Sequence, residues 1–304
     1  MNATTGLAPS PARRLMRVFG VVRYRFFLYA GLLPYLLGAA WAYALAGAID
    51  VPIFASGLGG VILSVIGVEA FNEYFDARMG TDRVFNPDDV PPIATAVFWI
   101  GTVAFAAALA VGIFLAIRGG WPILAFALLG GAAGIFYEAP PIRWSYRGLG
   151  ELVIALSYGP WMVLGSLYLH THSVSWAALA ASLVPAFFIM ALAVVNAIPD
   201  FHQDRLVGKR NLVVRLGRER AVTLYLGLAA AGLLVVVAGV IAGAFPPTSL
   251  AALLAAPLVV GSGRSALRTF STPRLFLPAM RSMVLAYLVA TGAFTAAIFM
   301  QAWR

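Results

Sequence analysis

The feature that most constrains this chain is a series of long apolar stretches without a single Asp, Glu, Lys or Arg. These stretches cover residues 26–49, 51–68, 90–117, 119–137, 152–199, 221–263 and 282–303. A membrane-spanning helix needs about 20 mostly apolar residues. Charged residues make up only 11% of the chain, whereas soluble domains carry roughly a quarter. The sequence therefore predicts an integral membrane protein.

Two of the stretches are too long for one span, and each contains a natural break. The stretch 152–199 breaks at His170-Thr171-His172-Ser173, and the stretch 221–263 breaks at Pro246-Pro247-Thr248. The resulting fold class is all-α, with nine transmembrane helices in a bundle. We expect one membrane domain over 26–304, preceded by a basic segment, 1–25, that lies along the inner membrane surface.

The placement of Lys and Arg predicts which helix ends face the cytoplasm. With nine spans and an inner N-terminus, all 21 Lys and Arg residues except Arg118 and Arg304 fall on the inner side. Inner segments of membrane proteins carry such an excess. The net charge of +9 is thus explained by topology and anionic lipid, not by a nucleic-acid partner. We predict a multi-pass protein of the plasma membrane with its C-terminus outside.

The chain has no cysteine and only three histidines. Disulfides, thiolate metal sites and cysteine nucleophiles are therefore excluded, and a histidine-rich metal site is not expected. Any metal or catalytic site must be built mainly from oxygen ligands and basic side chains.

Two polar clusters stand at predicted inner helix ends. The first, 72–82, follows the second span, and the other, 196–204, follows the sixth. Both begin with the pattern N-x-x-x-D, whose two polar residues share one face of a helix. In the second cluster this face continues only if the helix runs past Pro199. Four spans separate the clusters, so both lie on the same side of the membrane, as two related halves around one site would place them.

Clusters of carboxylate and amide oxygens suit a hard cation. Mg²⁺ typically takes one or two carboxylates and completes its shell with water and substrate phosphate oxygens, so two clusters can share one diphosphate. The metal ligands we predict are Asn72, Asp76, Asp82, Asn196, Asp200 and Asp204. The alternative is that these side chains cap helices or pair with arginines at the membrane surface.

Further candidates lie beside these clusters. Lys209 and Arg210 follow the second cluster, and basic groups stabilise a leaving diphosphate; membrane anchoring is the alternative role. Tyr137, at the end of the fourth span, is a candidate substrate contact or an interfacial anchor, and Arg143 follows it in the loop. Glu69, one turn before Asn72 and closer to the hydrocarbon, is a candidate metal ligand or proton acceptor.

These motifs resemble those of the UbiA superfamily of intramembrane prenyltransferases. N-E-Y-F-D-A-R-M-G-T-D (72–82) resembles the family's first motif, and N-A-I-P-D-F-H-Q-D-R-L-V-G-K-R (196–210) resembles the second. Y-E-A-P-P-I-R (137–143) and R-G-L-G-E-L (147–152) match the loop after the fourth span. The glycine before Asp82 and the Gly-Lys-Arg run are most similar to the branch that makes menaquinone.

The resemblance implies a nine-helix bundle around a central cavity and Mg²⁺-dependent transfer of a polyprenyl group from polyprenyl diphosphate to an aromatic acceptor. The branch likeness implies 1,4-dihydroxy-2-naphthoate as that acceptor. The implied catalytic residues are Asp76, Asp200, Lys209, Arg210 and Tyr137, and the implied substrate-binding residues are Arg23, Arg143, Lys209 and Arg210. The expected partners are the two substrates and membrane lipid, with no obligate protein partner.

Several residues depart from the family pattern and leave the acceptor open. Glu73 stands where Asp is usual, Asn211 where Thr is usual, and Glu69 where Asn is common; R-Y-R-F (23–26) replaces the usual Arg-Pro-x-Thr. Other acceptors compatible with the motifs are 4-hydroxybenzoate, homogentisate and a lipid alcohol. A transporter is a different-class alternative, because repeated halves with intramembrane carboxylates occur there too, although transporter sites lie near the midplane. A non-catalytic scaffold would need no matched Asp clusters.

Overall fold

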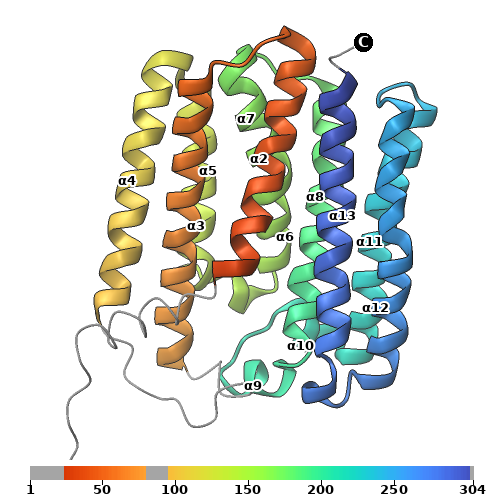
Figure 1. Ribbon diagram of the computed structural model, residues 1–304. Coiled ribbons are helices and arrows are strands. Elements are labelled where there is room, and N and C mark those ends of the chain that lie inside the picture. Colours follow the sequence, from red (N-terminus) through yellow and green to blue (C-terminus); the bar gives the residue numbers. More distant parts are fainter. Residues whose placement is uncertain (1–23, 80–94, 302–304) are drawn as a thin grey trace, which may run out of the picture.

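The computed structural model describes residues 24–79 and 95–301, and within them every regular element is a helix (Figure 1). Most of the predicted N-terminal segment, with Arg23, and the predicted ligand Asp82 lie outside the described residues. The elements are α2 Tyr24–Ala46, α3 Val51–Met79, α4 Thr95–Gly119, α5 Trp121–Glu138, η2 Trp144–Arg147, α6 Gly150–Leu156, η3 Ser157–Trp161, α7 Met162–Thr171, α8 Trp176–Ala197, α9 Phe201–Leu206, α10 Leu212–Leu216, α11 Arg218–Ile241, η4 Pro247–Ala255, α12 Ala256–Thr269, η5 Pro273–Leu275 and α13 Leu277–Gln301.

The predicted all-α membrane fold is confirmed. In the described ranges, 8 helical segments are long and apolar enough to cross a membrane, and the apolar part of α2, Gly31–Ala46, is a shorter candidate. Together they correspond to the nine predicted spans. The sixth span is α8, and the fifth combines α6, η3 and α7. The eighth span begins as the 3₁₀ segment η4, and Pro257 stands in the first turn of α12, where its missing N–H costs no helical hydrogen bond.

Successive spans alternate in direction, so their ends gather in two layers (Figure 1). The C-terminal ends of α3, α5 and α8 lie at the same end of the bundle as α9 and α10, which is the lower end in Figure 1. We call this the Asp-rich end, because it holds both polar clusters. The C-terminal end of α13 lies at the opposite end.

Helix α8 forms the centre of the bundle. Its side chains are apolar all round, and its buried positions are mostly alanine and other small or branched residues such as Ala181, Val184 and Val195. A helix that is apolar on every face is a core helix, and small residues allow neighbouring membrane helices to approach closely. It packs against α2, α6, α11 and α13. The second polar cluster is therefore attached to the best-buried helix.

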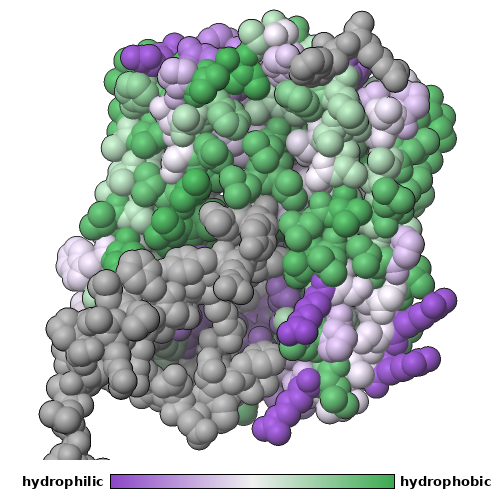
Figure 2. Space-filling model, viewed as in Figure 1, coloured by the Kyte–Doolittle hydropathy of each residue, from purple (hydrophilic) through white to green (hydrophobic). Residues whose placement is uncertain are grey.

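The outer faces of the bundle are apolar. Figure 2 shows a hydrophobic surface across most of the visible face, with hydrophilic side chains gathered near the two ends. Large exposed residues include Trp99, Val103, Ile117 and Leu234. In a soluble protein such a surface would be an aggregation hazard, whereas here it is the surface that contacts lipid.

A close crossing between α2 and α7 offers a test of the packing. Gly38 of α2 faces Ser166 of α7, whose hydroxyl donates a buried hydrogen bond of 2.8 Å to the carbonyl of Tyr35. A Cβ atom at Gly38 would overlap the carbonyl oxygen of Val163 and lie 2.6 Å from the Ser166 Cβ. The two helices therefore cannot keep this separation if residue 38 has a side chain.

We expect Gly38→Ala to destabilise the protein by about 1–3 kcal/mol, the usual effect of overpacking. The measurement is the thermal unfolding temperature of purified protein in detergent. Gly227→Ala in α11 is the matched control, because a Cβ there meets nothing within 4 Å, and alanine is the better helix former. Equal unfolding temperatures for Gly38→Ala and the parent chain would contradict the close packing of α2 against α7 at residue 38.

Candidate active site

The first polar cluster lies on one face of α3. Asn72 and Asp76 are one turn apart near the C-terminal end of this helix, and Glu69 and Glu73 flank them on the same face. All four line one cavity. The amide oxygen of Asn72 is buried and has no hydrogen-bond partner in the described part of the chain. The helix continues past the predicted apolar span, 51–68, and thereby carries the cluster to the Asp-rich end.

The second polar cluster does not lie on one continuous helix. The helix does not run past Pro199: α8 ends at Ala197, a turn follows, and α9 begins at Phe201, because proline has no N–H to donate within a helix. Asn196 belongs to the last turn of α8, Asp200 precedes α9 and Asp204 lies within it. Asp200 is the N-cap residue of α9, and its carbonyl accepts a hydrogen bond of 2.8 Å from the Asp204 amide.

Both clusters open into the same cavity, which has a volume of about 1250 Å³. Besides Asn72 and Asp76, it is lined by Asn196, Asp200 and Asp204 of the second cluster. Most of its remaining wall is apolar and runs along α3, α4, α5 and α7 toward their opposite ends, as far as Leu115, Ile123 and Leu169. The cavity is therefore polar at the Asp-rich end and apolar in its depth. This places the two predicted clusters at one site.

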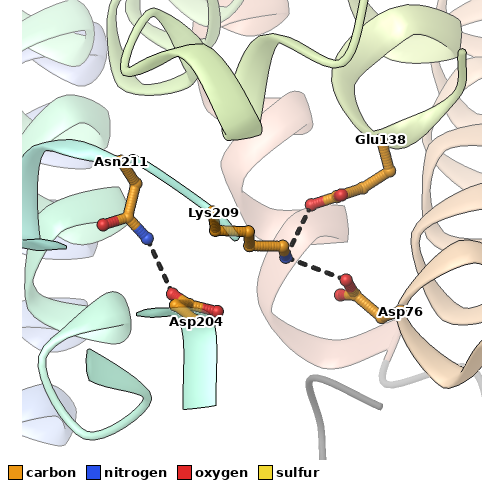
Figure 3. Close-up of polar contacts among 5 residues, drawn as sticks. All are labelled: Asp76, Glu138, Asp204, Lys209 and Asn211. Carbon is orange, nitrogen blue, oxygen red and sulfur yellow. Dashed lines mark hydrogen bonds and ion pairs between the residues drawn. The ribbon is translucent and has the colours of Figure 1, made fainter. Parts of the chain in front are cut away.

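Lys209 connects the two halves of this site (Figure 3). Its ammonium group lies 2.8 Å from Asp76 Oδ1 of α3 and 2.9 Å from Glu138 Oε1 at the end of α5. The Lys209 and Glu138 side chains are only 9% and 3% exposed, whereas that of Asp76 is 28% exposed. Hydrogen bonds between charged groups are the strong ones. The lysine thus ties the loop after α9 to two other helices.

Electrostatics keep this lysine charged despite its burial. Burial alone lowers the pKa of the Lys209 ammonium, but the carboxylates of Asp76, Glu138 and Asp204 raise it more, so that the pKa lies well above its usual value. Burial raises the pKa of Asp204 to about 6, while Lys209 and a hydrogen bond from Asn211 act in the opposite direction. The site therefore holds the positive charge of Lys209 among several oxygen groups, and Arg281 of α13 also lines the cavity.

The loop that carries Lys209 has a defined shape. The backbone amide of Lys209 donates to the Asp204 carbonyl at 2.8 Å. Gly208, the residue before it, has φ +83°, a conformation that favours glycine. Asn211 donates to Asp204 Oδ2 at 2.7 Å and caps α10 by accepting from the Val214 amide at 2.8 Å. These contacts fix the lysine relative to the second cluster.

The remaining predicted residues fall in different places. Tyr137 lines the cavity. The side chain of Arg210 is exposed and is not part of the cavity wall, although its carbonyl accepts a hydrogen bond of 2.8 Å from Arg215. Arg143 does not line the cavity either; its guanidinium lies 5.2 Å from the centroid of the Tyr146 ring, which the Lys209 ammonium approaches to 5.6 Å. The structure thus places Tyr137 in the cavity wall, whereas Arg143 and Arg210 do not line the cavity.

Sequence reasoning missed three residues of this site. Glu138 pairs with Lys209, Asn211 bonds to Asp204, and Glu151 accepts a hydrogen bond of 2.8 Å from the Leu212 amide. All three are buried. One signal was available for Glu138 and Glu151, since both are acids directly beside apolar spans, where charge is costly.

The fold and the site define a multi-span membrane protein with an oxygen-rich cavity at one end. The UbiA prenyltransferase family matches residues 31–277, which is most of the chain, and the chain belongs to this family. The prediction of a UbiA prenyltransferase is confirmed.

The likeness to the menaquinone branch is also confirmed. Over 240 residues the chain is 30% identical to the 1,4-dihydroxy-2-naphthoate octaprenyltransferase of Mycobacterium tuberculosis, covering 74% of this chain and 77% of that protein. It is 26% identical over 236 residues to the enzyme of the same name from Bacillus subtilis, covering 76% of each. A 2-carboxy-1,4-naphthoquinone phytyltransferase from Synechocystis is 26% identical, over 71% of this chain and 72% of that protein.

Solved structures support the fold. A digeranylgeranylglyceryl phosphate synthase superposes with a TM-score of 0.64 at 14% identity, covering 95% of this chain and 99% of that one. A UbiA homolog from Archaeoglobus fulgidus bound to GPP and Mg²⁺ superposes with a TM-score of 0.61 at 16% identity, covering 91% and 99%. At these identities the likeness shows the fold alone.

Proposed function

We propose that this chain transfers a polyprenyl group from polyprenyl diphosphate to 1,4-dihydroxy-2-naphthoate, a step of menaquinone biosynthesis, and releases diphosphate. The observation that carries the proposal is the shared cavity: two Asn/Asp clusters and a buried lysine at one end, and an apolar chamber beyond them. The names of the naphthoate-prenylating relatives support the choice of acceptor.

The oxygen groups of the site fit Mg²⁺. Within the described residues, no three His, Cys, Asp or Glu side chains gather closely enough to form an all-protein metal site. Mg²⁺ rarely needs one, because it is usually bound by one or two carboxylates plus water and substrate phosphate. The buried amide oxygen of Asn72, which has no hydrogen-bond partner among the described residues, is a suitable ligand atom. We assign Asn72 and Asp76 to one Mg²⁺ site and Asn196, Asp200 and Asp204 to a second, with Asp82 retained as a sequence-based candidate.

The residues of the chain then have the following roles. When bound, Mg²⁺ would neutralise the diphosphate and so promote its departure. Lys209 stabilises the negative charge that grows on this leaving group, and Glu138 holds the lysine in place. The C–O bond of the donor breaks with its electron pair going to diphosphate, an acceptor ring carbon forms the new C–C bond, and the ring then loses a proton or carboxyl group.

The apolar chamber serves the lipid part of the donor. Its walls exclude water, which would otherwise quench an allylic cation. Three of its lining residues, Leu109 of α4, Leu128 of α5 and Leu285 of α13, are also among the large exposed apolar residues. The chamber is therefore continuous with the lipid-facing surface, and the donor can enter sideways from the bilayer.

We assign the Asp-rich end to the cytoplasmic side. Arg205, Arg215, Arg264 and Arg274 are exposed at this end, as the positive-inside rule expects. The proposal includes the basic segment 1–25 as an inner-surface element, with Arg23 as a substrate contact. A labelling experiment tests this orientation. In the Thr269→Cys variant, we expect a membrane-impermeant thiol reagent to leave the cysteine unlabelled in intact cells and to label it after the cells are opened.

The function is tested with purified protein in detergent. We expect Mg²⁺, geranylgeranyl diphosphate and 1,4-dihydroxy-2-naphthoate to give a prenylated naphthol product, detected by mass spectrometry. Matched reactions contain 4-hydroxybenzoate, homogentisate or a lipid alcohol in place of the naphthoate. If product formed with one of these three alternative acceptors and not with the naphthoate, the proposed acceptor would be wrong. If none of the four acceptors gave product, the proposed reaction would be wrong. Because detergent solution has no gradient, turnover there also speaks against a transporter.

A further inference from the structure

Glu69 is a buried carboxylate that the roles described so far do not use. It is only 7% exposed, belongs to the membrane-spanning part of α3 and lines the cavity. An ionisable side chain at such a depth is costly and marks a functional position. Its neighbours on the same wall are apolar, among them Val61, Val65 and Val68. The carboxylate is thus an ionisable group on a mostly apolar part of the chamber wall.

Its position relative to the first cluster is defined by the helix. Glu69 precedes Asp76 by seven residues on α3, which places it on the same face and about 10 Å further along the helix axis. If the diphosphate lies against Asp76 and Lys209, the carbon that leaves it points into the chamber. Glu69 lies one turn deeper than Asn72, on the chamber side of the first cluster, where we expect the reacting carbon.

A second polar group comes from another helix. Tyr158 belongs to the π-helical segment η3, where Gly159 has non-helical φ and ψ, and it is 8% exposed and lines the same cavity. Its hydroxyl lies within electrostatic range of Glu69. Interruptions of this kind are frequent at functional sites. The two side chains make a polar position within a mostly apolar wall of the chamber.

We propose that Glu69 accepts a hydrogen bond from a ring hydroxyl of the aromatic acceptor, and thereby selects hydroxylated rings. This rests on the proposed function and adds a specificity-determining residue to it. A site built to bind a substrate hydroxyl rejects analogues in which that hydroxyl is blocked. Tyr158 makes the cavity wall beside Glu69 more polar, and Glu69 selects between acceptors with a free and a blocked hydroxyl.

The test compares 1,4-dihydroxy-2-naphthoate with its two mono-O-methyl ethers. We expect the parent chain to prefer the free acceptor over at least one ether by roughly tenfold to a hundredfold in kcat/KM, as for loss of a hydrogen bond to a charged group. Glu69→Leu should lower this ratio to near one. Glu69→Gln keeps an acceptor oxygen without the charge, and should give an intermediate ratio.

Controls separate this role from others. Val68→Leu changes the neighbouring cavity wall without removing a polar group, and should leave the ratio unchanged. The KM for the donor and the Mg²⁺ concentration for half-maximal rate should also stay unchanged in Glu69→Leu. An unchanged acceptor ratio in Glu69→Leu would overturn the inference, as would a shift in Mg²⁺ dependence, which would make Glu69 part of the metal site. A parent chain that prenylates no aromatic acceptor would instead overturn the proposed function.

Discussion

Asp76→Ala is expected to lower prenyl transfer by roughly a hundredfold to a thousandfold, the range seen when one preorganised group that stabilises a transition state is removed. The carboxylate is proposed to bind Mg²⁺, and it also receives the 2.8 Å hydrogen bond from Lys209. Asp200→Ala should have an effect of the same order, because it lies in the other cluster and lines the same cavity. The measurement is product formation by purified protein at several Mg²⁺ concentrations.

The matched control for these variants is Asp50→Asn. Asp50 lies at the opposite end of α3 and accepts a 3.0 Å hydrogen bond from the Ile53 amide, and asparagine preserves such a cap. This variant should retain full activity. Unchanged activity in both Asp76→Ala and Asp200→Ala, with normal folding, would contradict the metal assignment.

Lys209→Met is expected to affect both activity and stability. It removes the cation that neutralises Asp76 and Glu138, and breaking a buried ion pair on one side typically costs about 3–5 kcal/mol. It also removes the positive charge proposed to stabilise the diphosphate, so activity should fall by roughly a hundredfold or more. Thermal unfolding in detergent and product formation measure the two effects separately.

A second substitution distinguishes structural from catalytic loss. Glu138→Gln added to Lys209→Met removes one of the unpaired buried charges, so much of the lost stability should return. Activity should not return, because the cation is still missing. Glu138→Gln alone should keep measurable activity. If activity in the double variant recovered together with the unfolding temperature, Lys209 would have only a structural role.

The sequence predicted the helices of this protein well, because in a membrane the apolar stretch itself determines the helix. Even the long stretch 152–199 was divided correctly: α7 ends at Thr171 and α8 begins at Trp176. The ends of spans were less certain, since a helix can carry polar residues beyond its apolar part. Thus α3 continues through the first cluster to Met79, and α13 begins at Leu277, before the predicted 282.

The composition of the site was only partly predictable. The repeated N-x-x-x-D pattern identified both clusters. For the first cluster the reason is that a helix face leaves a periodic trace in the sequence. The second cluster is divided between α8, a turn and α9, so its place at the same site could not be derived from one helix face. The ion pair between Glu138 and Lys209 leaves no such trace, since it joins residues 71 positions apart. Asn211 appeared only as a departure from the family pattern, whereas the structure shows it capping α10 and bonding to Asp204.

A cavity that is polar at one membrane surface and apolar in its depth affects how the substrates and the product move between water and the bilayer. Under the proposed reaction, a small ring that dissolves in water enters from the aqueous side, whereas the chain attached to it comes from the bilayer. Each methylene buried in the bilayer favours retention by about 0.8 kcal/mol, so the joined molecule has no practical route back to water. The enzyme would thus hand its product directly to the lipid phase, without a carrier.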